Sequence, residues 1–250
     1  MLAGAALGYA AALRLFPAVF ALGPFIGLLY AVYKRQYDLK VAYGKFFGGM
    51  VISVAVLAAS ATAVYGVAAG KEFFENSKRH SESVSANNVG LRNVLAHNFN
   101  RNKNFETYGN DSVWHTATVE ARKKVVPIYV AVVVIALFFF IPAVISGGTW
   151  QAIALGALFT PFMWSELSGY YYLFLMIVGA LFAVNWKVAF PLLCLGIVTK
   201  IGLVVGMRMS EFYFLFSAAI CIVALIIYWQ VNSLPLFWKQ ALSSLTTKKT

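Results

Sequence analysis

The sequence predicts an all-α polytopic membrane protein, a helix bundle with about seven apolar segments. Its composition carries this prediction, because 61% of the residues are hydrophobic, only 12% are charged, and the mean hydropathy is +0.75. Soluble domains hold about twice that share of charged residues. The cations behind the net charge of +11 lie mostly between apolar segments, where they set topology and meet lipid headgroups. We therefore expect membrane lipids as partners and no nucleic acid.

The N-terminal segment is an apolar run interrupted by Arg14-Leu15-Phe16-Pro17. A guanidinium inside such a run is costly in hydrocarbon and is often functional. Pro17 removes a backbone hydrogen bond, so we expect two half-helices, neither comfortably long enough to span a bilayer of about 30 Å. The pattern predicts a re-entrant hairpin or a strongly kinked span, with Arg14 near the bend.

The remaining elements follow in order along the chain. Residues 46–69 form a clean apolar span, and a polar region follows it. The later apolar segments are residues 125–145, 150–164, 170–184, 188–205 and 212–231. We divide the chain into N-terminal membrane helices at 1–70, an external segment at 71–124, a C-terminal membrane bundle at 125–231 and an interfacial amphipathic tail at 232–250.

The charges of the connecting segments predict the orientation. Residues 34–45 carry four cations and one acid, which favours the cytoplasmic side. One span later, residues 71–124 then lie outside, where acidic residues offset part of the positive charge. The external segment holds His80, His97 and His115, whose wide and irregular spacing argues against a metal site, so we read each as structural or solvent-exposed.

Two short stretches expected on the outer side contain candidate binding residues. Asparagines at the start of residues 88–95 predict a short capped helix there, with an ordered loop as the alternative. Glu166 precedes three tyrosines at 170–172, and a carboxylate in that position can hydrogen-bond sugar hydroxyls or act as a base. The alternative for the tyrosines is an aromatic belt at the membrane interface.

Lys200 lies within the apolar segment 188–205, and Arg208 lies just past its outer end. The functional interpretation is a pair of cations open toward a lipid phosphate. The alternative is a snorkelling lysine beside an ordinary flanking arginine. The sequence has neither a phosphate loop nor a Ser-His-Asp pattern, and we expect no cofactor.

The N-terminal residues carry a family resemblance. Residues 4–17, GAALGYAAALRLFP, followed by an apolar run and Lys34-Arg35, resemble a recurring element of polytopic C-type glycosyltransferases. The resemblance is strongest to the bacterial branch that uses polyprenyl-phosphate sugars. In that branch a small-residue helix, a Lys or Arg and a Pro precede an apolar helix and a basic cytoplasmic loop. The stretches 80–91 and 166–172 also resemble multi-pass proteins that carry this element.

The resemblance implies inverting transfer of a sugar from a polyprenyl-phosphate carrier at the outer face of a bacterial inner membrane, with residues 71–124 in the periplasm. The cations expected to hold the lipid phosphate are Arg14, Lys200 and Arg208. The residues expected to contact the sugar or the acceptor are Glu166, Tyr170, Tyr171, His80 and Asn88. A pocket for this reaction would be bordered by residues 85–95 and 166–172.

One departure from the family pattern leaves the catalytic residue unknown. Enzymes of this class carry their catalytic acid in the first external loop, before the Arg-x-x-Pro element, and no residue of this chain matches it. The chain is then expected to be the C-terminal part of a longer enzyme or a shortened relative without catalysis. The alternative function is a non-catalytic transmembrane subunit that packs within a larger membrane complex. A transporter function is less well supported, because the apolar segments lack the paired carboxylates of ion-coupled transporters.

Overall fold

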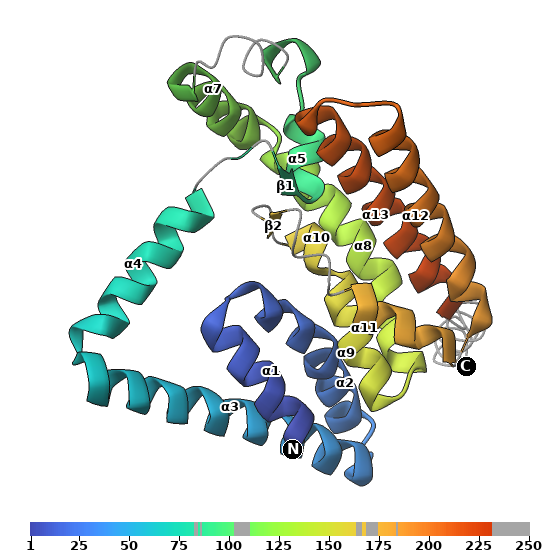
Figure 1. Ribbon diagram of the computed structural model, residues 1–250. Coiled ribbons are helices and arrows are strands. Elements are labelled where there is room, and N and C mark those ends of the chain that lie inside the picture. Colours follow the sequence, from blue (N-terminus) through green and yellow to red (C-terminus); the bar gives the residue numbers. More distant parts are fainter. Residues whose placement is uncertain are drawn as a thin grey trace, which may run out of the picture.

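The computed structural model describes residues 1–82, 85, 87–102, 111–163, 167–168, 175–183 and 185–231, and it shows an all-α membrane helix bundle (Figure 1). The predicted fold class is confirmed. Among the described residues, five helical segments are long and apolar enough to cross a membrane, and two apolar helices are shorter. The five are Phe16–Tyr33, Tyr37–Tyr65, Val126–Ser146, Trp186–Val204 and Met209–Val231, and the shorter two are Leu2–Leu13 and Thr149–Leu158.

The N-terminal segment breaks where its sequence predicts. Helix α1 (Leu2–Leu13) ends at Arg14, whose backbone is extended with φ −148° and ψ 122°. The 3₁₀ helix η1 (Phe16–Ala21) follows, with Pro17 in its first turn, and leads directly into α2 (Leu22–Tyr33). The expectation that neither half could span is wrong for the second half, since η1 and α2 form one run of 18 residues. Pro17 begins that run and therefore interrupts no hydrogen bond within it.

Helix α3 (Tyr37–Tyr65) begins earlier than the sequence suggests. The segment at 34–45, expected to be a loop, is mostly the start of this helix, and the turn before it is short. Arg35 makes the turn with φ 57°, and Asp38 in the first turn of α3 favours a helix start. Beyond Gly49 nearly every residue of α3 is exposed. Gly66, with φ 79°, separates α3 from α4 (Ala68–Glu82).

The segment expected to be external and the C-terminal half complete the bundle. The former contains β1 (Asn88–Val89), α5 (Leu91–Ala96) and α7 (Asp111–Lys124). The later elements are α8 (Val126–Ser146), α9 (Thr149–Leu158), α10 (Thr160–Met163), β2 (Leu167–Ser168), α11 (Leu175–Gly179), η3 (Ala180–Ala183), η4 (Trp186–Val188), α12 (Ala189–Val204) and α13 (Met209–Val231). Of the apolar segment expected at 170–184, the described part holds only the short α11 and η3. The predicted interfacial tail at 232–250 lies outside the described residues.

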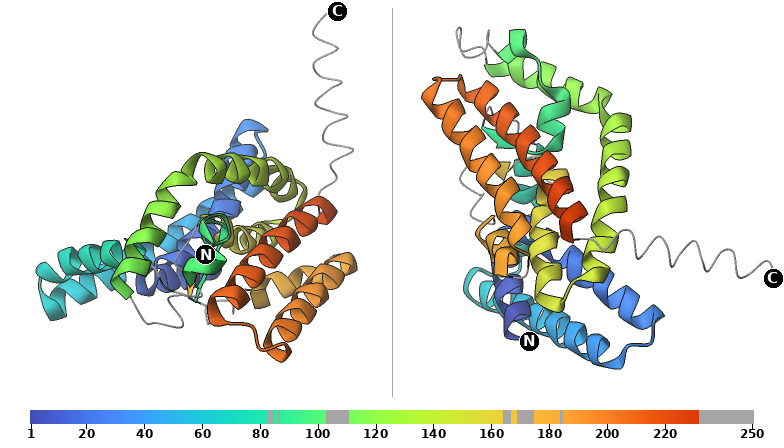
Figure 2. Two further views of the ribbon diagram at one scale, coloured as in Figure 1. Left: turned by 90° about the horizontal axis from the view of Figure 1, so that it is seen from above. Right: turned by 90° about the vertical axis from the view of Figure 1, so that its right-hand side faces the viewer.

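An aromatic core joins α8, α9, α10 and α13. Phe140 of α8 stacks on Phe159 with ring centroids 4.6 Å apart, and Tyr228 of α13 lies 5.3 Å from Phe140. All three are completely buried. The hydroxyl of Tyr228 donates a 3.2 Å hydrogen bond to the carbonyl of Leu155, which satisfies its polar atom within the core. Figure 2 shows α12 and α13 running side by side, with α8 on the other side of the bundle.

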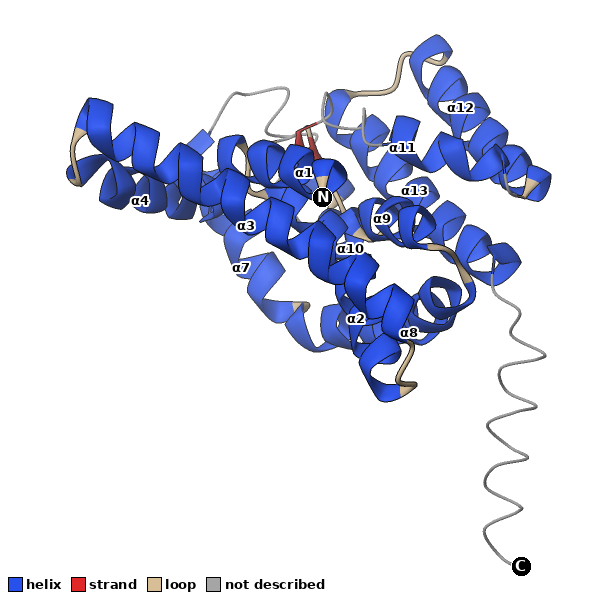
Figure 3. Cartoon of the chain, turned by 90° about the horizontal axis from the view of Figure 1, so that it is seen from below, coloured by secondary structure: helices blue, strands red, loops and turns tan. Residues whose placement is uncertain are grey.

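Glycines fix the N-terminal hairpin between two neighbouring helices. A Cβ on Gly8 of α1 would meet the backbone of Met50 in α3. On the other side, a Cβ on Gly23 of α2 would meet the carbonyl oxygen of Ala152 in α9. Small residues allow this close approach of helix backbones, as is common between helices in membranes. The hairpin is therefore held between α3 and α9, and Figure 3 shows α3 passing close beneath α1.

Candidate functional site

A short β-ladder joins two segments that are far apart in the sequence. Strand β1 pairs antiparallel with β2, so that Asn88 lies opposite Ser168 and Val89 lies opposite Leu167. The pairing brings Asn88 beside Ser168, while Glu166, Tyr170 and Tyr171 lie outside the described part of the chain. The two segments expected to border a pocket thus meet at this ladder, which we call the β1–β2 junction.

The bend after α1 lies on the same side of the molecule as this junction. Helix α10 precedes β2 by a few residues, and both η1 and α5 pack against α10. Figures 1 and 3 both show the strand pair close to the end of α1. Arg14 occupies the bend between α1 and η1, and its side chain is exposed. The fold therefore places the α1–η1 bend, which carries Arg14, on the same side as the β1–β2 junction.

The other residues expected at the site lie elsewhere. Lys200 is exposed on α12, where it ends an open apolar groove, and Arg208 is exposed in the turn between α12 and α13. Figures 1 and 2 place this turn well away from the α1–η1 bend. His80 lies on α4, which is separate from the β1–β2 junction in Figure 1, and its side chain is outside the described part. The structure does not bring these three residues together with Arg14.

Asn88 is buried at the centre of a hydrogen-bond network. With its amide oriented toward the neighbouring donors, Oδ1 accepts from the backbone N–H of Ser85 at 3.1 Å and from Nη2 of Arg122 at 3.3 Å. Its carbonyl oxygen accepts a 2.8 Å bond from Nδ2 of Asn93. A buried amide with several partners has a fixed orientation.

The expected asparagine-capped helix at 88–95 is wrong in its start. Helix α5 begins at Leu91, its N-cap is Gly90, and no side chain caps it. Gly90 has φ 142°, a conformation that glycine adopts readily and residues with a Cβ avoid. Its N–H donates to Oγ of Ser217 in α13 at 3.1 Å. This contact attaches the turn between β1 and α5 to the membrane bundle and leaves Asn88 in a strand.

Arg92 is a site residue that the sequence does not single out. Its guanidinium carbon lies 4.5 Å from the ring centroid of Tyr129 in α8. The Tyr129 hydroxyl donates a 2.8 Å hydrogen bond to the carbonyl of Phe162, in α10. The Nε of Arg92 is buried and has no hydrogen-bond partner among the described residues. The one sequence signal for Arg92 is its place four residues after Asn88.

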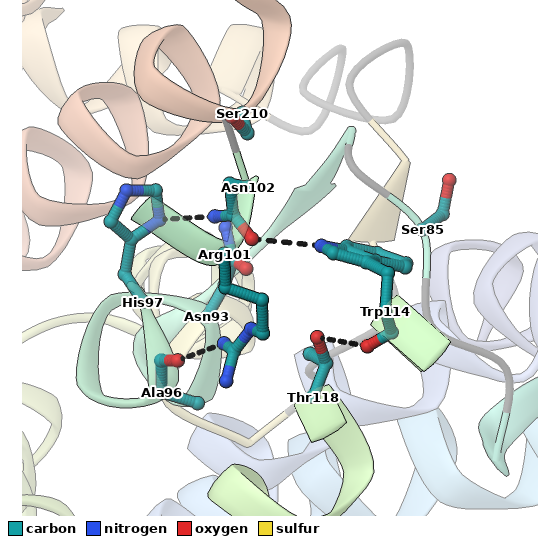
Figure 4. Close-up of a pocket in the computed structure, with 9 residues that line it drawn as sticks. All are labelled: Ser85, Asn93, Ala96, His97, Arg101, Asn102, Trp114, Thr118 and Ser210. Atoms are coloured by element: carbon teal, nitrogen blue, oxygen red, sulfur yellow. Dashed lines mark hydrogen bonds between the residues drawn. The ribbon is translucent and has the colours of Figure 1, made fainter. Parts of the chain in front are cut away.

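A small polar cavity lies between α5, α7 and the start of α13 (Figure 4). The amide of Asn102 lies between two aromatic side chains: its Nδ2 is 3.1 Å from Nδ1 of His97, and its Oδ1 accepts a 2.8 Å bond from Nε1 of Trp114. Both Asn102 and Trp114 are buried. His97 is also packed against Phe214 of α13, with ring centroids 4.4 Å apart. The side chains around the cavity thus hold α5, α7 and α13 together.

Arg101 links α5 to α7 at the edge of this cavity. Its Nη2 donates to the carbonyl of Ala96 at 2.7 Å, and its Nη1 donates to the carbonyl of Ala117 at 3.3 Å. Partial burial lowers the pKa of Arg101 from its ordinary value. The two carbonyl contacts use its charge for structure, in contrast to Arg92, for which the described residues offer a ring and no hydrogen-bond acceptor.

Several helices long and apolar enough to cross a membrane, with a polar junction at one end of the bundle, define a polytopic membrane protein. The model of Glycosyltransferase family 87 matches residues 1–165, and the chain belongs to this family of polytopic membrane glycosyltransferases. The expected resemblance to such enzymes is therefore confirmed. The match covers α1 to α10, which include Arg14, Asn88 and Arg92. The comparisons with curated proteins and with solved structures give no match.

Proposed function

We propose that this chain acts in the transfer of a sugar from a polyprenyl-phosphate carrier at the outer face of a bacterial inner membrane. The reaction site would be the β1–β2 junction together with the α1–η1 bend. Membership of a membrane glycosyltransferase family supports the reaction class. The observation that supports the site is the pairing of Asn88 with Ser168, which joins β1 to a strand that Glu166 precedes in the sequence.

Arg14 is the carrier-phosphate ligand in this proposal. It lies at a bend in an otherwise apolar hairpin, so that the isoprenoid chain would lie in the membrane while the phosphate meets the guanidinium. Lys200 on α12 and Arg208 in the turn after it belong to other elements, and the side chain of His80 is not described, so the proposal assigns these residues no role.

The sugar and the acceptor would bind above Arg14. Asn88, Glu166, Tyr170 and Tyr171 offer an amide, a carboxylate and phenols for hydroxyl groups. In the reaction, the acceptor oxygen bonds to the anomeric carbon, the bond from that carbon to the phosphate oxygen breaks, and the acceptor proton passes to a carboxylate base. The base itself is not assigned to a residue. Residues 71–124 would then face the periplasm, as the cation-rich segment at 34–45 favours the cytoplasm.

A second function, that of a transmembrane subunit, has one observation in its favour. The part of α3 beyond Gly49 exposes a long apolar surface, including Val51, Ile52 and Val56, to which the other described helices make little contact. Such a surface suits lipid or another membrane protein equally well. The two functions differ in whether the purified chain binds the carrier lipid.

Binding of polyprenyl phosphate to the full chain in lipid nanodiscs tests the proposal. We expect the wild-type chain to bind the carrier, Arg14→Ala to lose this binding while remaining folded, and Arg14→Lys to retain part of it, because the paired donors of the guanidinium are lost. Arg79→Ala, a change on exposed α4, serves as the control. Lack of binding by the wild-type chain would contradict the proposal. Intact binding by a destabilised Arg14→Ala chain would mean that Arg14 is structural.

A further inference from the structure

We propose that Arg92 is a second guanidinium that binds the phosphate of the carrier lipid, and that Arg122 is a positioning residue for Asn88 beside it. The inference rests on the proposed function, because it assigns further residues to the same site. It differs from the expectation from the sequence, which gave the phosphate to Lys200 and Arg208 together with Arg14.

The contact of Arg92 with Tyr129 fixes where its guanidinium lies. The guanidinium carbon is held 4.5 Å from the ring centroid, and an aromatic face takes up none of the strong hydrogen-bond donors of the group. The ring is itself held in place, because the Tyr129 hydroxyl is bonded to the carbonyl of Phe162. Phe162 belongs to α10, and β2 begins a few residues later. The charge of Arg92 is therefore fixed beside the β1–β2 junction.

The charge of Arg92 is not balanced by a described carboxylate. Among the described residues, the salt bridge within 4 Å joins Lys71 and Glu75 on α4, and it does not involve Arg92. Arg92 is half-buried, and its Nε has no described hydrogen-bond partner. A partly desolvated cation without a counter-ion is costly unless an anion binds to it. Phosphate is the anion that a guanidinium recognises best, through paired hydrogen bonds.

Arg122 of α7 lies beside the same strand. Its Nη2 donates to Oδ1 of Asn88 at 3.3 Å, and the backbone carbonyl of Asn88 accepts from Nδ2 of Asn93, the neighbour of Arg92 in α5. Arg92 in turn covers Tyr129, near the start of α8. The amide that we assign to sugar contact is thus held by one guanidinium, and the other lies four residues along the chain from it.

The test is the affinity of the full chain for polyprenyl monophosphate, measured in nanodiscs of phosphatidylcholine, with the phosphate-free polyprenol as a second probe. Arg92→Met keeps an unbranched apolar stem and removes the guanidinium with its charge. We expect it to weaken binding of the monophosphate by about tenfold or more, and to leave binding of the polyprenol unchanged. Arg92→Lys keeps the charge without the planar fork, and we expect a smaller loss of several-fold. The control is Arg79→Met on α4, which we expect to bind as the wild type does.

The outcomes separate this inference from the proposed function. A wild-type chain that does not distinguish the monophosphate from the polyprenol contradicts the proposed function itself. A wild-type chain that does distinguish them, together with a folded Arg92→Met chain of wild-type affinity, overturns the role of Arg92 alone. If Arg92→Met does not fold, wild-type affinity in Arg92→Lys overturns it instead. Equal displacement of the probe by phosphatidylglycerol would show a general site for anionic lipids and would also overturn the assignment.

Discussion

The N-terminal hairpin and the polar lobe of β1, α5 and α7 are stabilised by opposite means. In the hairpin of α1, η1 and α2, glycines such as Gly8 and Gly23 bring helix backbones into direct contact with α3 and α9. In the polar lobe, side chains such as Asn88, Arg101 and Asn102 donate to or accept from neighbouring atoms. The hairpin depends on residues without a side chain, and the lobe depends on polar side chains that form hydrogen bonds.

The difference follows from the solvent of each region. Within lipid, apolar side chains gain little by meeting each other, so close packing of small residues holds helices together. At the membrane surface, polar groups are abundant and are stable when buried only if each finds a partner. Added atoms should therefore damage the hairpin most, and removed polar atoms should damage the lobe most. The proposed site lies where the two regions meet.

The largest effect is expected from a single added methyl in the hairpin. Gly23→Ala places a Cβ against the carbonyl of Ala152, a backbone atom that cannot move aside alone. We expect a loss of about 3 kcal/mol, at the upper end for overpacking, seen as a lower thermal midpoint in detergent micelles. Gly48→Ala is the matched control, because a Cβ there meets nothing within 4 Å. That change should be neutral or stabilise α3 by up to about 1 kcal/mol. Equal midpoints for the two variants would refute the glycine contact.

A smaller effect is expected from a removed amide in the lobe. Asn102→Ala takes away the acceptor of Trp114 Nε1 and the neighbour of His97 Nδ1 in a buried place. We expect a loss of about 1–2 kcal/mol. Hydrogen–deuterium exchange should become faster in α5 and α7 and remain unchanged in α1 and α2. The exposed Asn100→Ala is the control. Faster exchange throughout the hairpin would mean that the two regions are not stabilised separately.

The sequence predicts the hairpin better than the lobe, for a physical reason. Arg14 and Pro17 act on their own backbone, so the break between α1 and η1 can be read from neighbouring residues. Helix α3 begins earlier than expected, because the charges of residues 37–45 suggest a loop but do not end a helix. The role of Arg92 depends on Tyr129, in a different helix, and no local pattern encodes such a contact. The exposed surface of α3 is likewise as apolar as a buried one, so composition alone does not tell a surface that faces lipid from one that packs against protein.

The smallest effect is expected where the two regions meet. Tyr129→Phe removes the hydroxyl that bonds to the carbonyl of Phe162 and keeps the ring under Arg92. We expect a loss of about 1 kcal/mol in stability, since one hydrogen bond is removed. Affinity for polyprenyl phosphate should fall only slightly, because the stacked face of the guanidinium remains.

Tyr129→Leu provides the contrast, since it removes the ring as well. If the ring holds Arg92 in its binding position, the leucine variant should lose carrier affinity by a clearly larger factor than the phenylalanine variant, measured by the same nanodisc assay. Equal affinity in both variants would contradict a role for stacking. The packing of α5 against α13 and α10 would then be what holds Arg92 in position, and the polar lobe would not depend on the Tyr129 ring of α8.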